Sequence, residues 1–218
     1  MTQFRIVLVT TGLVLALMGG TLQAQAAATP MQNFQMPATP APVPVNLDPN
    51  TTALLLLDLV DDICAAQPSC QSQMLPAMAP FMTKVREAGA TIIYGTRAPR
   101  MDSWMPEVAP HAGDIKIINS VQDRFFNTDF DQQLKAKGIQ TIIIAGWRIS
   151  GSITFTSVGA MDHGYTVVIP MDATSSPSDY ETAIGFFMVQ NAGTRNPENE
   201  PLIPNAVTLS RTDLIGFR

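Results

Sequence analysis

Six short segments of the chain are apolar at consecutive positions rather than at alternate ones. A continuous apolar run is typical of a strand that is buried on both faces, as in a parallel sheet. The first of these runs, Thr52 to Leu57, is followed directly by an acid, Asp58. We expect strands at residues 52–58, 91–94, 115–118, 141–146, 165–170 and 206–209.

Between these apolar runs, apolar residues recur at the spacing of a helix. Apolar residues recur every three or four positions from Met74 to Val85, and Gly89 marks the expected end of that helix. Further helices are expected at about residues 128–138, 151–163 and 178–191. Strands that alternate with helices form βαβ units, so the pattern predicts one α/β domain over residues 51–218, without an internal repeat. The polar stretch at residues 193–205 is predicted to be an insertion or a partner-contacting arm.

The first 50 residues follow neither pattern. Arg5 precedes an apolar stretch up to Met18, and small residues with Ala-x-Ala spacing follow as far as Ala28. This arrangement is typical of a secretory signal peptide, predicted at residues 1–26. The alternative is an uncleaved anchor, but the run is short for a spanning helix of about 20 residues. We expect a periplasmic or secreted protein without a membrane segment after cleavage, with a Pro-rich, extended and exposed arm at residues 27–50.

If the protein is exported, its two cysteines are in an oxidising compartment. Cys64 and Cys70 are separated by five residues, and a close pair in an oxidising compartment predicts a disulfide. A redox pair is the alternative, although the C-x-x-C spacing that such pairs usually have is absent.

Composition excludes several classes of function. The net charge of −5 without a basic run argues against a nucleic-acid partner. Two Cys and two His are too few for a zinc site of the usual Cys/His kind, so we expect no metal. The chain has neither a Gly-rich dinucleotide signature nor a phosphate loop, so no cofactor is expected and the predicted ligand is a small molecule.

The candidate chemistry lies where predicted strands end. In open α/β sheets, ligands bind beyond the carboxyl ends of the strands. If the strands at 52–58 and 141–146 are neighbours, Asp58 faces the same crevice as the turn at residues 146–152. Backbone N–H groups at the helix start in this turn would suit a carboxylate or an oxyanion, with Ser152 as nucleophile or hydrogen-bond donor. The alternatives are structural: Asp58 as a loop cap and Ser152 as a helix N-cap.

Four segments carry a family resemblance. They are Leu54–Asp58, Phe125–Phe130, Gly138–Gly146 and Gly164–Asp172, and their order and spacing resemble the isochorismatase-like hydrolases, also called cysteine hydrolases. The resemblance covers about residues 50–215. It implies a Rossmann-like three-layer α/β/α sandwich with a mostly parallel six-stranded sheet in the order 3-2-1-4-5-6. It also implies a tendency to form homo-oligomers.

The resemblance further implies a catalytic set of Asp, Lys and Cys. Only the Asp is present, as Asp58. The lysine position holds Asn119 and the cysteine position holds Ser152. Without a neighbouring lysine, we expect Asp58 to lack a cation and to be protonated, suited to donating a proton.

The remaining site predictions concern substrate contact. Asn119 and Arg148 are expected to orient the substrate, beside Trp147 and Ile149 of the same turn as Arg148. Arg97, Arg124 and Arg148 are candidates for positive charge at this edge of the sheet; the alternative for each is a solvated surface residue. A cis peptide near residues 147–149, which resembling proteins often show, is left open.

Two functions of different class remain. The leading one is an exported isochorismatase-like hydrolase that acts on a small amide, ester or vinyl ether bearing a carboxylate. Asp58 would be its proton donor or base, and Ser152 would stand at the usual cysteine position. The alternative is an inactive relative that binds a small acid or a protein partner in the same crevice. A purely structural assembly subunit is a third reading.

Overall fold

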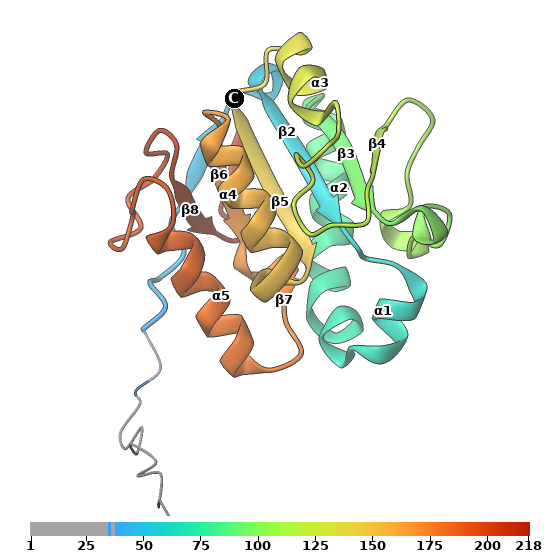
Figure 1. Ribbon diagram of the computed structural model, residues 1–218, viewed down its shortest axis with the longest axis horizontal. Helices are drawn as coiled ribbons and strands as arrows, with labels where there is room; N and C mark the ends of the chain where they lie inside the picture. Colours follow the sequence, from blue (N-terminus) through green and yellow to red (C-terminus); the bar gives the residue numbers. More distant parts are fainter. Residues whose placement is uncertain (1–34, 36–37) are drawn as a thin grey trace, which may run out of the picture. The chain divides into compact units, whose positions relative to one another are not determined.

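The computed structural model describes residue 35 and residues 38–218. The predicted signal peptide and residues 27–34 of the predicted arm therefore lie outside the described residues. Strands and helices alternate along the described chain, as Figure 1 shows. Within this part of the chain, no helix has the length and apolar character needed to cross a bilayer.

The central sheet follows the predicted strand order. Its path is β4-β3-β2-β5-β6-β8, which corresponds to the expected order 3-2-1-4-5-6, and each pairing along it is parallel. A two-residue strand, β7 (Thr174–Ser175), also pairs with β5, so the sheet has one strand more than predicted. The six strands of the path are β2 (Thr52–Leu57), β3 (Thr91–Thr96), β4 (Ile115–Ile118), β5 (Thr141–Trp147), β6 (Thr166–Pro170) and β8 (Val207–Ser210).

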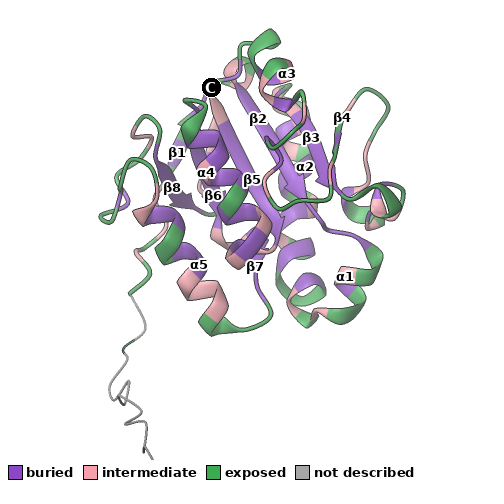
Figure 2. Ribbon diagram, in the orientation of Figure 1, coloured by how far each residue is buried: buried purple, intermediate pink, exposed green. Residues whose placement is uncertain are grey.

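Helices cover both faces of this sheet, as expected for three layers (Figures 1 and 2). Leu54 and Leu56 point to the face covered by α1 (Asp61–Ala66) and α2 (Leu75–Ala88). Leu55 and Leu57 belong to the core on the other face. The helices on that face are α3 (Phe130–Ala136), α4 (Thr154–Asp162) and α5 (Asp179–Asn191). Because side chains alternate along a strand, a run buried at each position fills both cores.

The predicted exposed arm differs from the structure near its end. Val45 and Leu47 are buried in β1 (Val45–Leu47), which pairs with β9 (Ile215–Phe217) at the other end of the chain. The prediction of an exposed arm is therefore wrong for Val45 and Leu47, whereas Asn46 between them is exposed. The sequence predicted neither strand, because three-residue strands have too little pattern to detect.

The polar 193–205 stretch has a structural role at the sheet edge. The Asn199 side chain donates to the carbonyl of Leu209 at 2.9 Å and accepts from its N–H at 2.7 Å. These bonds occupy backbone groups on β8, an edge strand, that would otherwise lack strand partners.

Candidate functional site

Asp58 follows β2 at the point where the strand order reverses. β2 pairs with β3 on one side and β5 on the other, and Leu57 lies level with Gly95 and Gly146 in these strands. The residues that follow the three strands therefore meet at one edge of the sheet. Asp58 adopts a positive φ of 51° and only 6% of its surface is exposed.

Two donors hold the Asp58 carboxylate. The Thr96 hydroxyl, at the end of β3, donates to Oδ1 at 2.5 Å. Arg124, in the loop after β4, donates from Nη2 to Oδ2 at 3.0 Å and forms a buried ion pair. The expectation that Asp58 lacks a cation is therefore wrong. The guanidinium reaches Asp58 from a loop 66 residues away in the chain.

Arg124 is itself held from several sides. Its Nη1 donates to the side-chain oxygen of Asn119 and, at 2.9 Å, to the carbonyl of Val121. Its stem passes over Gly95, where a Cβ would lie 3.2 Å from Nε. Burial lowers the pKa of Arg124, and the Asp58 carboxylate opposes this effect. A Cβ at position 95 would also lie 2.7 Å from Cδ2 of Leu57, so a side chain there would force Leu57 or Arg124 to shift.

The turn after β5 brings Ser152 to the same place. The Trp147–Arg148 peptide bond is cis. A helical turn at Ile149–Ile153 follows, and α4 begins at Thr154, three residues later than the helix start predicted at Gly151. Gly151 lies against Arg148, since a Cβ there would be 2.9 Å from Nε. This turn leaves Ser152 half-buried at the start of the helical segment.

Asp58 and Ser152 line one cavity of about 320 Å³. Of the predicted substrate-contacting residues, Arg97, Arg124, Trp147 and Arg148 also line it. Ile149 does not, because it is buried against Gly185 of α5. Asn119 does not either, and its side chain contacts Arg124 instead. The sequence analysis missed six further lining residues: Ile63, Gln67, Arg100, Val121, Gln122 and Pro177.

The cavity is rich in arginine. Arg100 pairs with Asp62 at 2.6 Å, and Arg148 lies 3.6 Å from Glu181. The Arg97 side chain has neither a hydrogen bond nor an ion pair with another residue of the described part of the chain. With one acid, Asp58, among the lining side chains, the charge favours an anionic ligand.

The Cys64–Cys70 disulfide is present, as predicted. It connects α1 to the segment before α2, and two residues of this region, Ile63 and Gln67, line the cavity. Elsewhere in the described residues, no three His, Cys, Asp or Glu side chains are grouped as a metal site would require.

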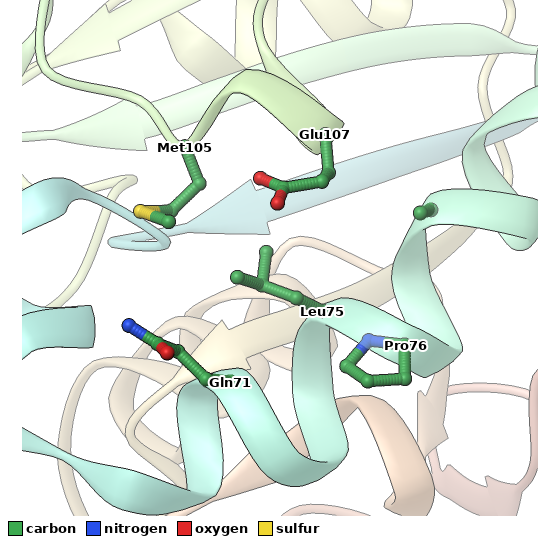
Figure 3. Close-up of a pocket in the computed structure, with 6 residues that line it drawn as sticks. Gln71, Leu75, Pro76, Met105 and Glu107 are labelled. Atoms are coloured by element: carbon green, nitrogen blue, oxygen red, sulfur yellow. The ribbon is translucent and has the colours of Figure 1, made fainter.

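A larger hollow of about 460 Å³ lies elsewhere, between α2 and the loop at residues 105–108 (Figure 3). Leu75, Pro76 and Met105 supply much of its wall, with Gln71 and Glu107 as its polar groups. It has no nucleophile and no paired carboxylate, so the smaller, charged cavity is the better candidate site.

Comparison with known proteins agrees with this geometry. The family model for the isochorismatase domain matches residues 52–198, most of the described chain. The chain belongs to the isochorismatase family. This confirms the resemblance found in the sequence and makes the protein a member of a family of hydrolases.

The family relatives include proteins with and without a named activity. An uncharacterized isochorismatase family protein of Bacillus subtilis, YwoC, is 25% identical over 180 residues, which cover 71% of this chain and 94% of that protein. Maleamate amidohydrolase of Pseudomonas putida is 36% identical over 62 residues, covering 28% of this chain and 29% of that enzyme.

Among solved structures, N-carbamoylsarcosine amidase from Thermoplasma acidophilum matches with a TM-score of 0.61 and 19% identity. The match covers 75% of this chain and 97% of that one. An isochorismatase family protein from Desulfovibrio vulgaris matches with a TM-score of 0.62 at 19% identity, covering 75% and 95% of the two chains. At this identity the likeness shows the fold alone.

Proposed function

We propose that this isochorismatase-family protein is an exported hydrolase that cleaves an amide, ester or vinyl ether bond in a small molecule with a carboxylate. The observation that carries the proposal is that Asp58 and Ser152, from two different strand ends, line one arginine-rich cavity. A single cavity therefore offers an acid–base group, a hydroxyl and positive charge.

The chemistry assigned to these groups is acyl or ether hydrolysis. A serine hydroxyl is a weak nucleophile and needs a base. Asp58 has one of two roles: as a base it takes the proton from Ser152 or from an attacking water, directly or through one water, and as an acid it donates a proton to the leaving group. Arg148, which lines the cavity, stabilises the negative charge that develops on the substrate oxygen.

The arginines support an anionic substrate. Arg97 has no acid to pair with among the described residues, and a substrate carboxylate would pair with it through charge-assisted hydrogen bonds. The name maleamate amidohydrolase, carried by one relative, denotes an enzyme that cleaves an amide. That relationship supports amides as the first substrates to test.

Export is part of the same proposal. The apolar segment before Ala26 supports it, and a disulfide between Cys64 and Cys70 is the kind of bond that persists in the periplasm or outside the cell. The mature protein then begins in the Pro-rich arm.

A second candidate is an inactive relative that binds a small acid in the same cavity. The arrangement of Asp58 favours it, because both carboxylate oxygens already accept hydrogen bonds from Thr96 and Arg124. A serine in the position of the family's cysteine points the same way.

Turnover of a panel of small amides, esters and vinyl ethers tests the two candidates. The mature protein is compared with Asp58→Asn, Ser152→Ala and a control, Asp213→Asn, which removes an exposed carboxylate outside the cavity. A hydrolase should lose at least about a hundredfold in Asp58→Asn, as expected for removal of an acid–base group, and nothing in Asp213→Asn. If the wild type is inert while a small acid raises its melting temperature, the binding function is correct.

A further inference from the structure

Arg124 is one of the largest side chains that the fold buries completely, with 2% of its surface exposed. Charged side chains are rarely buried to this degree unless they are paired. Removing one partner of a buried pair leaves an uncompensated charge, so the two residues depend on each other. Arg124 and Asp58 form such a pair at the floor of the candidate site.

The donors of Arg124 are committed within the protein. Nη2 donates to Asp58, and Nη1 donates to Asn119 and to the carbonyl of Val121. The buried Nε has no hydrogen-bond partner among the described residues and lies over Gly95. Because both ends of the guanidinium, Nη1 and Nη2, already donate within the protein, Arg124 acts on a reaction chiefly through Asp58.

We propose that Arg124 is a positioning residue that keeps Asp58 ionised, so that Asp58 acts as a base and not as the initial proton donor, and that Asn119 orients Arg124 for this task. This inference rests on the proposed function, which leaves both roles of Asp58 open. It assigns Asn119 to the support of Arg124 instead of to the substrate.

Hydrogen-bond chemistry supports the ionised form. Arginine only donates, so a proton on Oδ2 of Asp58 would face another donor at 3.0 Å. Thr96 donates to the other oxygen, and a proton on Oδ1 would require its hydroxyl to turn and accept instead. An ionised carboxylate accepts both bonds without conflict.

The other charges around Asp58 act in the same direction. Arg97 follows β3, Arg100 lies in the next turn, and Arg148 follows β5; all three line the cavity together with Asp58. No second acid is among the lining residues, so no like charge favours a proton on Asp58. Two of these arginines are paired with acids that do not line the cavity: Arg100 with Asp62, and Arg148 with Glu181.

The test removes, keeps or relocates the positive charge next to Asp58. Arg124→Gln removes the charge, Arg124→Lys keeps it, and the double variant Arg124→Gln with Asn119→Lys supplies it from the neighbouring position. Asn119 contacts the guanidinium, so a lysine there can bring its ammonium to the space that Arg124 leaves. Arg86→Gln is the control, because Arg86 also forms a hydrogen-bonded ion pair with an aspartate, Asp114, but outside the cavity.

Two properties are measured for each of these variants. The first is the pH profile of kcat/KM, in which the acid limb reports loss of the base form. The second is the carbon-13 NMR signal of the Asp58 carboxyl, assigned by its absence in Asp58→Asn, which reports ionisation without any turnover. Arg124→Gln should move both midpoints to higher pH by about one to three units, the usual effect of losing an adjacent opposite charge. KM should change less than kcat, because the hydrogen bonds of Arg124 go to Asp58, Asn119 and Val121.

Either lysine variant should return the midpoints toward the wild-type values, and Arg86→Gln should leave them unchanged. Unchanged midpoints in Arg124→Gln, or failure of both lysine variants to restore them, would overturn the proposal. If Arg124→Gln does not fold, Asn119→Ala replaces it, since it frees the guanidinium and should move the midpoints the same way by a smaller amount; no movement overturns the proposal. If the protein hydrolyses nothing, the hydrolase function fails, whereas the NMR midpoint still decides the role of Arg124.

Discussion

The Thr96 hydroxyl lies 2.5 Å from Oδ1 of Asp58, and this bond joins the ends of two adjacent parallel strands. Thr96 is fully buried and follows the register in which Leu57 pairs with Gly95. The carboxylate is therefore fixed by the sheet itself, through Thr96, and by a loop, through Arg124. Such support on rigid elements is what a catalytic or binding group needs in order to keep its geometry.

Ser152→Cys should raise turnover of small amides at least about tenfold, because a thiol is partly ionised near neutral pH and a hydroxyl is not. The new thiol should also react with iodoacetamide, which the wild type lacks a free cysteine to do. Mass spectrometry and amide turnover check both expectations. A variant that is neither faster nor alkylated would show that position 152 cannot reach a substrate.

The order of the six main strands was predicted from the family resemblance, and the meeting of Asp58 with Ser152 follows from that order. Both residues follow continuous apolar runs, and strand ends of a parallel sheet meet at one edge. Arg124 was a candidate for positive charge at this edge, but its pairing with Asp58 was not predicted, because Arg124 lies in an irregular loop and no periodic pattern specifies which side chain such a loop turns inward. The sequence placed the turn that contains Ile149 correctly. It did not show that α5 covers the Ile149 side chain, which only the structure reveals.

Arg97→Gln should weaken the binding of a small carboxylate such as butyrate by about tenfold or more, since a charge-assisted hydrogen bond contributes about 1.5–3 kcal/mol. The uncharged analogue butyramide should bind the wild type weakly and lose nothing in the variant. Isothermal titration calorimetry measures both. Arg195→Gln is the control, because Arg195 contacts Asn191 away from the cavity. Equal binding of butyrate and butyramide would contradict an anion site at Arg97.

Loss of the disulfide should cost about 2 kcal/mol of unfolding free energy, the value expected for closing so short a loop in the chain-entropy model. Urea unfolding of the double variant Cys64→Ala and Cys70→Ala measures this cost. Because Gln67 lies between the two cysteines and lines the cavity, ligand affinity should fall as well. Dithiothreitol should destabilise the wild type and leave the double variant unaffected. Equal stability of the two proteins would show that the bond adds nothing to the fold.

The raised pKa of the buried Tyr94 hydroxyl predicts that the folded state loses stability at alkaline pH. Its fully buried hydroxyl donates to the carbonyl of Val108 at 2.8 Å, and burial raises the pKa of Tyr94 to about 12, with Asp114 acting in the same direction and Arg86 against it. A pKa raised in the folded state favours the protonated form, so its contribution is complete below the unfolded pKa of about 10. It is then lost as the pH rises from about 10 to about 12, and a shift of two pKa units corresponds to about 2–3 kcal/mol.

Urea unfolding at pH 9 and pH 11 measures this loss. Tyr94→Phe should be less stable than the wild type at pH 9, by the roughly 1 kcal/mol of one hydrogen bond. It should lose less stability than the wild type between the two pH values, because the titrating group is gone. A residual slope is expected from Tyr165, whose pKa burial also raises. The full wild-type slope in Tyr94→Phe would mean that Tyr94 does not set the alkaline limit.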